Sequence, residues 1–173
     1  GGGIYNDGTD LTITRSTFTS HVTSNTTVND GHGGGLYTSG GTVTITSSTF
    51  SLNQAARESE SADGGAVYQG GGTVTITDST LSTNSSGDDG GGLYVGSTTT
   101  TITNSTFTLN TASTTRSAAA GGGLYGTAGI VTITSSTFSY NYAGSSGGGT
   151  RVDSSSTITI TSSTFKGNSA QAN

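Results

Sequence analysis

The stretch GGGLYTSGGTVTITSSTFSLN, residues 33–53, decides the fold, because near copies of it follow one another along the whole chain. The copies open at Gly1, Gly33, Gly64, Gly90, Gly121 and Gly147. A fixed phrase that returns every 26 to 32 residues indicates one supersecondary unit stacked on itself. We therefore expect a single β-solenoid segment over residues 1–173, with coils at 1–32, 33–63, 64–89, 90–120, 121–146 and 147–173.

Within one copy, apolar residues mark the strands. Val43 and Ile45 alternate with threonines, which is the period of a strand with one buried face. Phe50 lies five residues after Ile45, so the alternation breaks and the chain turns a corner at Ser47 and Ser48. Three apolar columns run through the copies: Ile4, Leu36, Val67, Leu93, Leu124 and Thr150; Ile13, Ile45, Ile76, Ile102, Ile133 and Ile160; and Phe18, Phe50, Leu81, Phe107, Phe138 and Phe165.

Three inward columns predict three short strands per coil, stacked into parallel sheets with essentially no helix. The fold class expected is therefore an all-β parallel β-helix. The segments after the conserved phrase, such as 85–89 and 142–146, are expected to be loops that emerge along one edge. An asparagine column, Asn53, Asn84, Asn110, Asn141 and Asn168, is expected to form a stacked amide ladder inside the turn, with His21 in the first coil.

Composition limits the function. Only 28% of the residues are hydrophobic and 9% are charged, yet the strict placement of the apolar residues excludes a disordered chain. Five basic residues against a net charge of −5 argue against nucleic-acid binding. The sequence contains no run of about 20 apolar residues, so it does not predict a membrane-spanning helix. The chain has no cysteine and is rich in hydroxyl residues and glycine, which favours an extracellular or cell-surface location.

The repeated pattern GGGIY/GGGLY…TITxSTFxxN resembles the right-handed parallel β-helix repeats of the polymorphic outer membrane protein type. The FxxN half reads FSLN, FTLN, FSYN and FKGN, while LSTN in the third coil and FTSH in the first depart from it. The resemblance covers all six coils. It implies a right-handed helix and a secreted or surface-displayed bacterial protein, such as an adhesin, and it implies no catalytic residue.

The last coil ends where another copy could begin in frame, and neither end shows a capping repeat. Unpaired strand edges at an end face are a template for further pairing. We therefore expect the partner of each end to be further coils of the same chain or another copy stacked end to end as a filament.

Outward threonines form the most regular surface of the predicted solenoid. Strand alternation places two columns outside: Thr12, Thr44, Thr75, Thr101, Thr132 and Thr159, and Thr14, Thr46, Thr77, Thr103, Thr134 and Thr161. Three interpretations remain open. The threonines serve strand propensity and solubility, they carry O-glycans, or they bind ice, since TxT arrays on β-solenoids resemble those of insect antifreeze proteins.

Other candidate sites are weaker. The sequons at Asn25, Asn84 and Asn104 are N-glycan candidates, with Asn25 favoured because the other two have structural duties. Asp63, Asp88 and Asp89 precede glycine-rich starts in adjacent coils and are a weak Ca²⁺ candidate, so no cofactor is expected beyond that ion. A tyrosine column, Tyr5, Tyr37, Tyr68, Tyr94 and Tyr125, is interpreted as a stabilising stack, with a sugar-binding strip as the alternative.

The serious rival function is a carbohydrate-active enzyme of the pectin-lyase-like β-helix class. Such chemistry needs carboxylates gathered on one sheet face, whereas most acids here are expected in loops. The sequence thus favours a non-enzymatic structural solenoid, a fibre-forming, adhesin or surface-layer module that meets glycans or host and cell surfaces. Ice binding is the other alternative.

Overall fold

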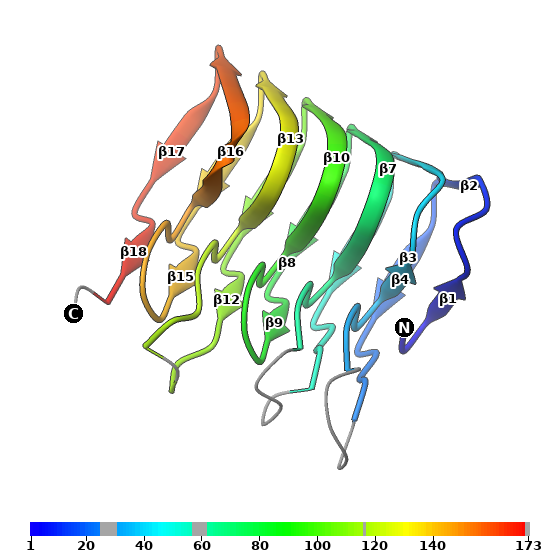
Figure 1. Cartoon of the computed structure of the whole chain (residues 1–173), viewed down its shortest axis with the longest axis horizontal. Helices are drawn as coiled ribbons and strands as arrows, with labels where there is room; N and C mark the ends of the chain where they lie inside the picture. The colour runs from blue at the N-terminus through cyan, green and yellow to red at the C-terminus, as the bar shows by residue number, and fades with distance from the viewer. Residues whose placement is uncertain (25–30, 57–61, 116, 172–173) are drawn as a thin grey trace.

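The computed structural model describes residues 1–24, 31–56, 62–115 and 117–171. Over these residues the chain is a parallel β-solenoid of three sheets without a helix (Figure 1). Successive coils lie side by side along the axis, and the two termini lie at opposite ends. The expected all-β parallel solenoid is confirmed. Within the described ranges no helix has the length and apolar character needed to cross a membrane.

The first sheet contains the residues that follow the glycines and the TxTxT stretch. Its strands are β1 (Ile4–Asn6), β2 (Leu11–Thr14), β4 (Leu36–Thr38), β5 (Thr42–Thr46), β7 (Val67–Thr77), β10 (Leu93–Thr103), β13 (Leu124–Thr134) and β16 (Thr150–Thr161). In the first two coils two short strands are separate, as expected. From β7 onward they are one long strand, because neighbours such as Gly71 and Ser97 stay paired through the bend.

The second sheet carries the aromatic column, in strands β3 (Thr17–Thr19), β6 (Thr49–Ser51), β8 (Thr80–Ser82), β11 (Thr106–Thr108), β14 (Thr137–Ser139) and β17 (Thr164–Lys166). The third sheet consists of β9 (Ser85–Ser86), β12 (Thr111–Ala112), β15 (Tyr142–Ala143) and β18 (Ser169–Ala170). The sequence interpretation placed these residues in loops, which is wrong. Strands of two residues are too short to show an alternation.

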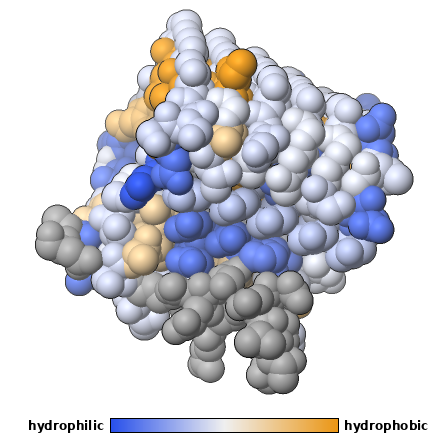
Figure 2. All heavy atoms as spheres, in the orientation of Figure 1, coloured by the Kyte–Doolittle hydropathy of each residue, from blue (hydrophilic) through white to orange (hydrophobic). Residues whose placement is uncertain are grey.

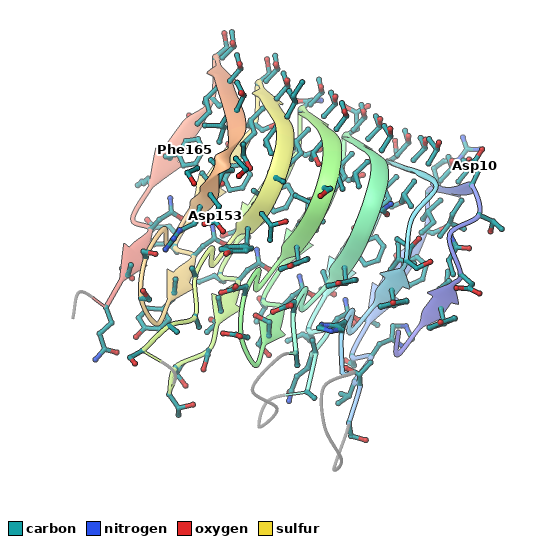
Figure 3. The ribbon with its side chains drawn as sticks, in the orientation of Figure 1. Asp10, Asp153 and Phe165 are labelled. Atoms are coloured by element: carbon teal, nitrogen blue, oxygen red, sulfur yellow. The ribbon has the colours of Figure 1, made fainter. Side chains whose placement is uncertain are left out.

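The core fills the space between the sheets with the three predicted columns. Ile45, Ile76 and Phe107 have no exposed surface, and the rings of Phe107 and Phe138 stack with centroids 4.6 Å apart. At the C-terminal end no coil covers the column, so Phe165 is 39% exposed (Figure 3). On the face shown in Figure 2, hydrophobic colour gathers toward this end, and the rest is mostly neutral or hydrophilic. The apolar surface is therefore buried between coils and incompletely covered at an end.

Glycine begins each coil because the backbone there has no room for a side chain. Gly90 has a φ of +64°, and a Cβ atom at this position would lie 2.6 Å from the carbonyl oxygen of Leu93. L-residues pay a steric penalty in this left-handed conformation, and glycine does not. The same conformation recurs at Gly33, Gly64, Gly121 and Gly147, which explains why the repeats share this residue.

Candidate functional site

The predicted asparagine ladder is present inside the turn between the second and third sheets. The backbone N–H of Asn53 and its Nδ2 both donate to Oδ1 of Asn84, each at 3.0 Å. Nδ2 of Asn53 also donates to the carbonyl of Phe18 in the preceding coil. The pattern repeats through Asn110, Asn141 and Asn168, while the His21 backbone N–H donates to Asn53. Since each buried amide group is engaged along the stack, the column stabilises the fold.

A serine ladder runs parallel to it at the corner between the first and second sheets. The backbone N–H of Ser48 donates to Oγ of Ser79 at 3.0 Å, and the Ser79 hydroxyl donates to the carbonyl of Thr77. The residue before each ladder serine has a positive φ, as at Asp78 and Asn104. These residues make the corner, and the serines link successive coils.

The structure brings Asp63, Asp88 and Asp89 together, as the sequence predicted. One carboxylate oxygen from each lies within 4.8 Å of the others. Two of these carboxylates also accept backbone hydrogen bonds from the next coil: Asp63 from the Asp89 N–H at 3.0 Å, and Asp89 from the Ala120 N–H at 2.7 Å. His32 begins the series, because its Nδ1 accepts the Asp63 N–H. The cluster therefore contains a third inter-coil ladder.

Burial raises the pKa of Asp89 to about 6, and the neighbouring Asp88 acts in the same direction. The hydrogen bond from Ala120 opposes this shift, because it favours the ionised carboxylate. Burial is also the main cause that raises the pKa of Tyr94 and of Tyr125, and the nearby Asp89 adds to both shifts. The pKa values of Asp89, Tyr94 and Tyr125 are thus all shifted toward the neutral form of the side chain.

The tyrosine column forms a continuous ring stack. Successive centroids from Tyr5 to Tyr125 lie 4.8 to 5.6 Å apart, and the His32 ring stacks on Tyr68 at 4.4 Å. A sugar ring binds to the open face of an aromatic side chain, but here neighbours cover the faces of the inner rings. The geometry favours the structural interpretation. The guanidinium of Arg151, next in the column, contacts Asp153 at 3.2 Å.

The outward threonines occupy the positions that the sequence assigned. The register sets the two predicted columns side by side on the first sheet. A third column, which the sequence analysis missed, joins them: Thr42, Thr73, Thr99 and Thr157, interrupted by Ile130. No hydroxyl of these columns has a hydrogen-bond partner within the described residues. Their hydrogen-bonding capacity therefore faces the surroundings.

The N-glycan candidates differ in access. Asn25 lies outside the described residues. Asn84 is buried in the asparagine ladder, so its amide is not available for a glycan. Asn104 is exposed, and its Nδ2 donates to the Asp78 carboxylate. Of the two described sequons, only Asn104 presents an accessible amide.

A surface groove that the sequence analysis missed follows the turn before the asparagine ladder. It has a volume of about 740 Å³ and is lined by Leu52, Asn53, Gln54, Thr83, Asn84, Ser85, Leu109, Thr111, Ser113, Thr114 and Thr115. Leu52 and Leu109 are more than half exposed, as is Tyr140 in the next coil. The sequence did contain one indication of this feature. Gly167 holds the equivalent position in the last coil, where three of the other coils have Leu52, Leu109 and Tyr140.

The comparisons with known proteins agree with this architecture. The family described as "Right handed beta helix region" matches residues 2–172. A search of curated proteins and a search of solved structures each gave no match. Since the match covers nearly the whole chain, and the chain folds as a parallel solenoid with continuous inter-coil ladders, the protein belongs to the right-handed beta-helix family.

Proposed function

We propose that the chain is a non-enzymatic structural segment of an extracellular or cell-surface protein, of the adhesin or fibre type that the polymorphic outer membrane protein repeats exemplify. One observation carries the proposal: four acidic side chains, those of Asp10, Asp63, Asp89 and Asp153, make contacts within the scaffold. Asp63 and Asp89 hold backbone N–H groups, and Asp153 pairs with Arg151. Asp10 accepts the backbone N–H of Thr42 at the opposite end of the solenoid from Asp153 (Figure 3).

The rival enzymatic function needs two carboxylates that are free to act on one substrate. In the cluster of Asp63, Asp88 and Asp89, two of the three carboxylates instead accept backbone N–H groups of neighbouring coils. Incubation with a panel of pectic and neutral polysaccharides should therefore give no products. Turnover that is abolished by Asp89→Asn but not by the exposed variant Asp7→Asn would overturn the proposal.

The end faces support an extended assembly. Ile160 and Phe165 are partly exposed, whereas Ile133 and Phe138 of the preceding coil are fully buried. Another coil on this face would bury both side chains, which favours association by about 25 cal/mol for each Å² of apolar surface removed from water. The covering coil comes from further repeats of the same protein or from a second copy. Electron microscopy of the purified chain tests the second copy: filaments would show that copies stack end to end, and uniform short rods would exclude such stacking.

The hydroxyl-rich face supports glycosylation of the threonine columns in an extracellular setting. Within the described residues, the hydroxyls of these columns have no hydrogen-bond partner, which leaves them free to act as O-glycan acceptors. Intact mass of native material, before and after chemical removal of O-glycans, tests this directly. A native mass equal to that of the bare polypeptide, 17.0 kDa for these residues, would refute glycosylation.

Ice binding is the second candidate, because the third threonine column makes the array wider than the sequence indicated. The hydroxyls and methyl groups repeat at about 4.8 Å between coils and about 6.7 Å along each strand, a regular lattice on one sheet. Thermal hysteresis of the unglycosylated protein is the test. Thr101→Tyr, in the middle of the lattice, should abolish hysteresis, whereas the outward Thr106→Tyr on the second sheet should not. A glycan coat on these threonines excludes this function.

A further inference from the structure

We propose that the groove beside the asparagine ladder binds a neutral glycan chain, with Leu52, Leu109 and Tyr140 as its contact ridge. This inference rests on the proposed extracellular role and names a partner and a site for it. The ridge lies at the residue before the ladder asparagine in each coil. It includes Thr83 between the two leucines, so it runs through four successive coils. At about 4.8 Å per coil, it extends for about 14 Å along the axis.

The first argument is conformational. Leu52, Leu109 and Tyr140 have φ values of +57°, +56° and +54°. Bulky side chains rarely adopt this left-handed conformation, and glycine adopts it without penalty. The chain itself supplies the comparison, because Gly167 occupies the same position in the last coil at +62°. The backbone turn therefore does not require a leucine or a tyrosine.

The second argument is exposure. The three side chains are 53 to 56% exposed, so they contribute little to the core while remaining in a strained conformation. A residue that is costly for the backbone and poorly buried is best explained by a contact outside the fold. The ridge borders the groove, whose lining includes both leucines, which gives that contact a defined place.

The lining identifies the chemical class of the partner. Leu52 and Leu109 supply apolar surface, and Gln54, Ser85 and Thr111 add amide and hydroxyl groups to the lining. Among the described residues that line the groove, none is charged, and all the polar ones are amides or hydroxyls. A sugar chain matches this mixture, because each ring has an apolar face and a rim of hydroxyls. Tyr140 adds an aromatic ring that is exposed rather than covered by a neighbouring ring in a stack.

The test uses the whole chain and three uncharged hexasaccharides as probes: cellohexaose, mannohexaose and chitohexaose. Isothermal titration calorimetry should detect binding of at least one of them. Leu109→Gly and Tyr140→Gly should each weaken that binding at least tenfold, while the Tm stays equal or rises because glycine relieves the backbone strain. This separation of affinity from stability is the expected signature of a ligand-contact ridge.

Ile130→Thr is the matched control, since it removes an equally exposed apolar side chain from the first sheet, away from the groove. It should leave binding unchanged. The proposal is overturned if none of the probes binds, if the glycine variants bind as well as the parent, or if they lower the Tm as a core substitution would. It is also overturned if sedimentation shows self-association that Leu109→Gly abolishes, because the occupant would then be a second copy. A failure to bind leaves the structural role intact, since rod shape and surface location are measured independently.

Discussion

The side chain of Asn110 accepts two hydrogen bonds from Asn84: its Oδ1 receives the Asn84 backbone N–H at 3.1 Å and the Asn84 Nδ2 at 2.9 Å. The two residues are 26 positions apart in the chain and meet only because the coils stack. Both are buried, so water cannot replace either bond. The ladder therefore ties the stability of each coil to the coil that follows it.

Replacing one ladder residue should destabilise the solenoid. Asn110→Ala leaves the buried Asn84 N–H without its acceptor and also removes the donor to the Leu81 carbonyl. We expect a loss of at least about 2 kcal/mol in the free energy of unfolding, because each buried unsatisfied group costs about 1 to 3 kcal/mol. Urea unfolding followed by circular dichroism measures it. Ser97→Ala, at an exposed strand position, should change the value by less than about 0.5 kcal/mol.

Each ring of the aromatic column should contribute to stability according to how fully it is buried. Phe107→Ala removes a fully buried ring that stacks on Phe138, and should cost about 3 to 5 kcal/mol through lost burial and a cavity. Phe165→Ala removes a partly exposed ring in the last coil and should cost less than half as much. The midpoints of guanidinium unfolding compare the two variants. Equal losses would contradict the packing described for the last coil.

Glycine substitutions should separate two kinds of position. Gly90→Ala places a methyl group 2.6 Å from a carbonyl oxygen in a left-handed conformation, so we expect destabilisation of at least about 1 to 2 kcal/mol. Gly71→Ala meets no atom closer than 3.9 Å, and should be neutral or stabilising because alanine restricts the unfolded chain. Thermal unfolding of the two variants gives the comparison. A tolerated Gly90→Ala would show that the coil start can relax.

Stability should depend on pH through Asp89. Its pKa is about 6 in the folded protein, against the ordinary value of 3.8. Between these values the folded state binds a proton that the unfolded state has released, so stability falls as the pH rises from about 4 to about 6. Above pH 6 the full penalty of a buried carboxylate remains.

Asp89→Asn should remove this pH dependence. The amide oxygen can still accept the Ala120 N–H, and no charge is buried. The variant should therefore exceed the parent in Tm at pH 7 and approach it at pH 4. Asp7→Asn, at an exposed position, should reproduce the parent profile. If Asp89→Asn lowers the Tm at pH 7, the carboxylate charge is stabilising, and the assigned direction is wrong.

Much of the fold could be predicted from the sequence because one stretch is repeated along the chain. Period-two alternation placed Val43 and Ile45 in the core, and the repeated aromatic column placed Phe50 there. The asparagine column was assigned to a ladder before any contact was known. The sequence did not predict that two short strands merge into β7, and it did not predict the strands of the third sheet. Alternation says which face a residue occupies, but not whether pairing continues through a bend or begins again over two residues.

The candidate sites divide in the same way. The sequence placed Asp63 and Asp89 near each other and two threonine columns outside, but it did not reveal the backbone hydrogen bonds of those carboxylates or the third threonine column. It did not reveal the groove, because Leu52 and Leu109 look like ordinary apolar residues until their exposure and backbone angles are known.

The sequence by itself determined the coil: its length, its inward residues, its glycine start and its polar ladder, all of which depend on local sterics and side-chain alternation. Only the tertiary structure decided what neighbouring coils share. The hydrogen bonds of the asparagine ladder join residues 26 to 35 positions apart, and the groove is formed by side chains from three coils at once. Such contacts depend on register between coils, and register is set when the sheets and the core pack together.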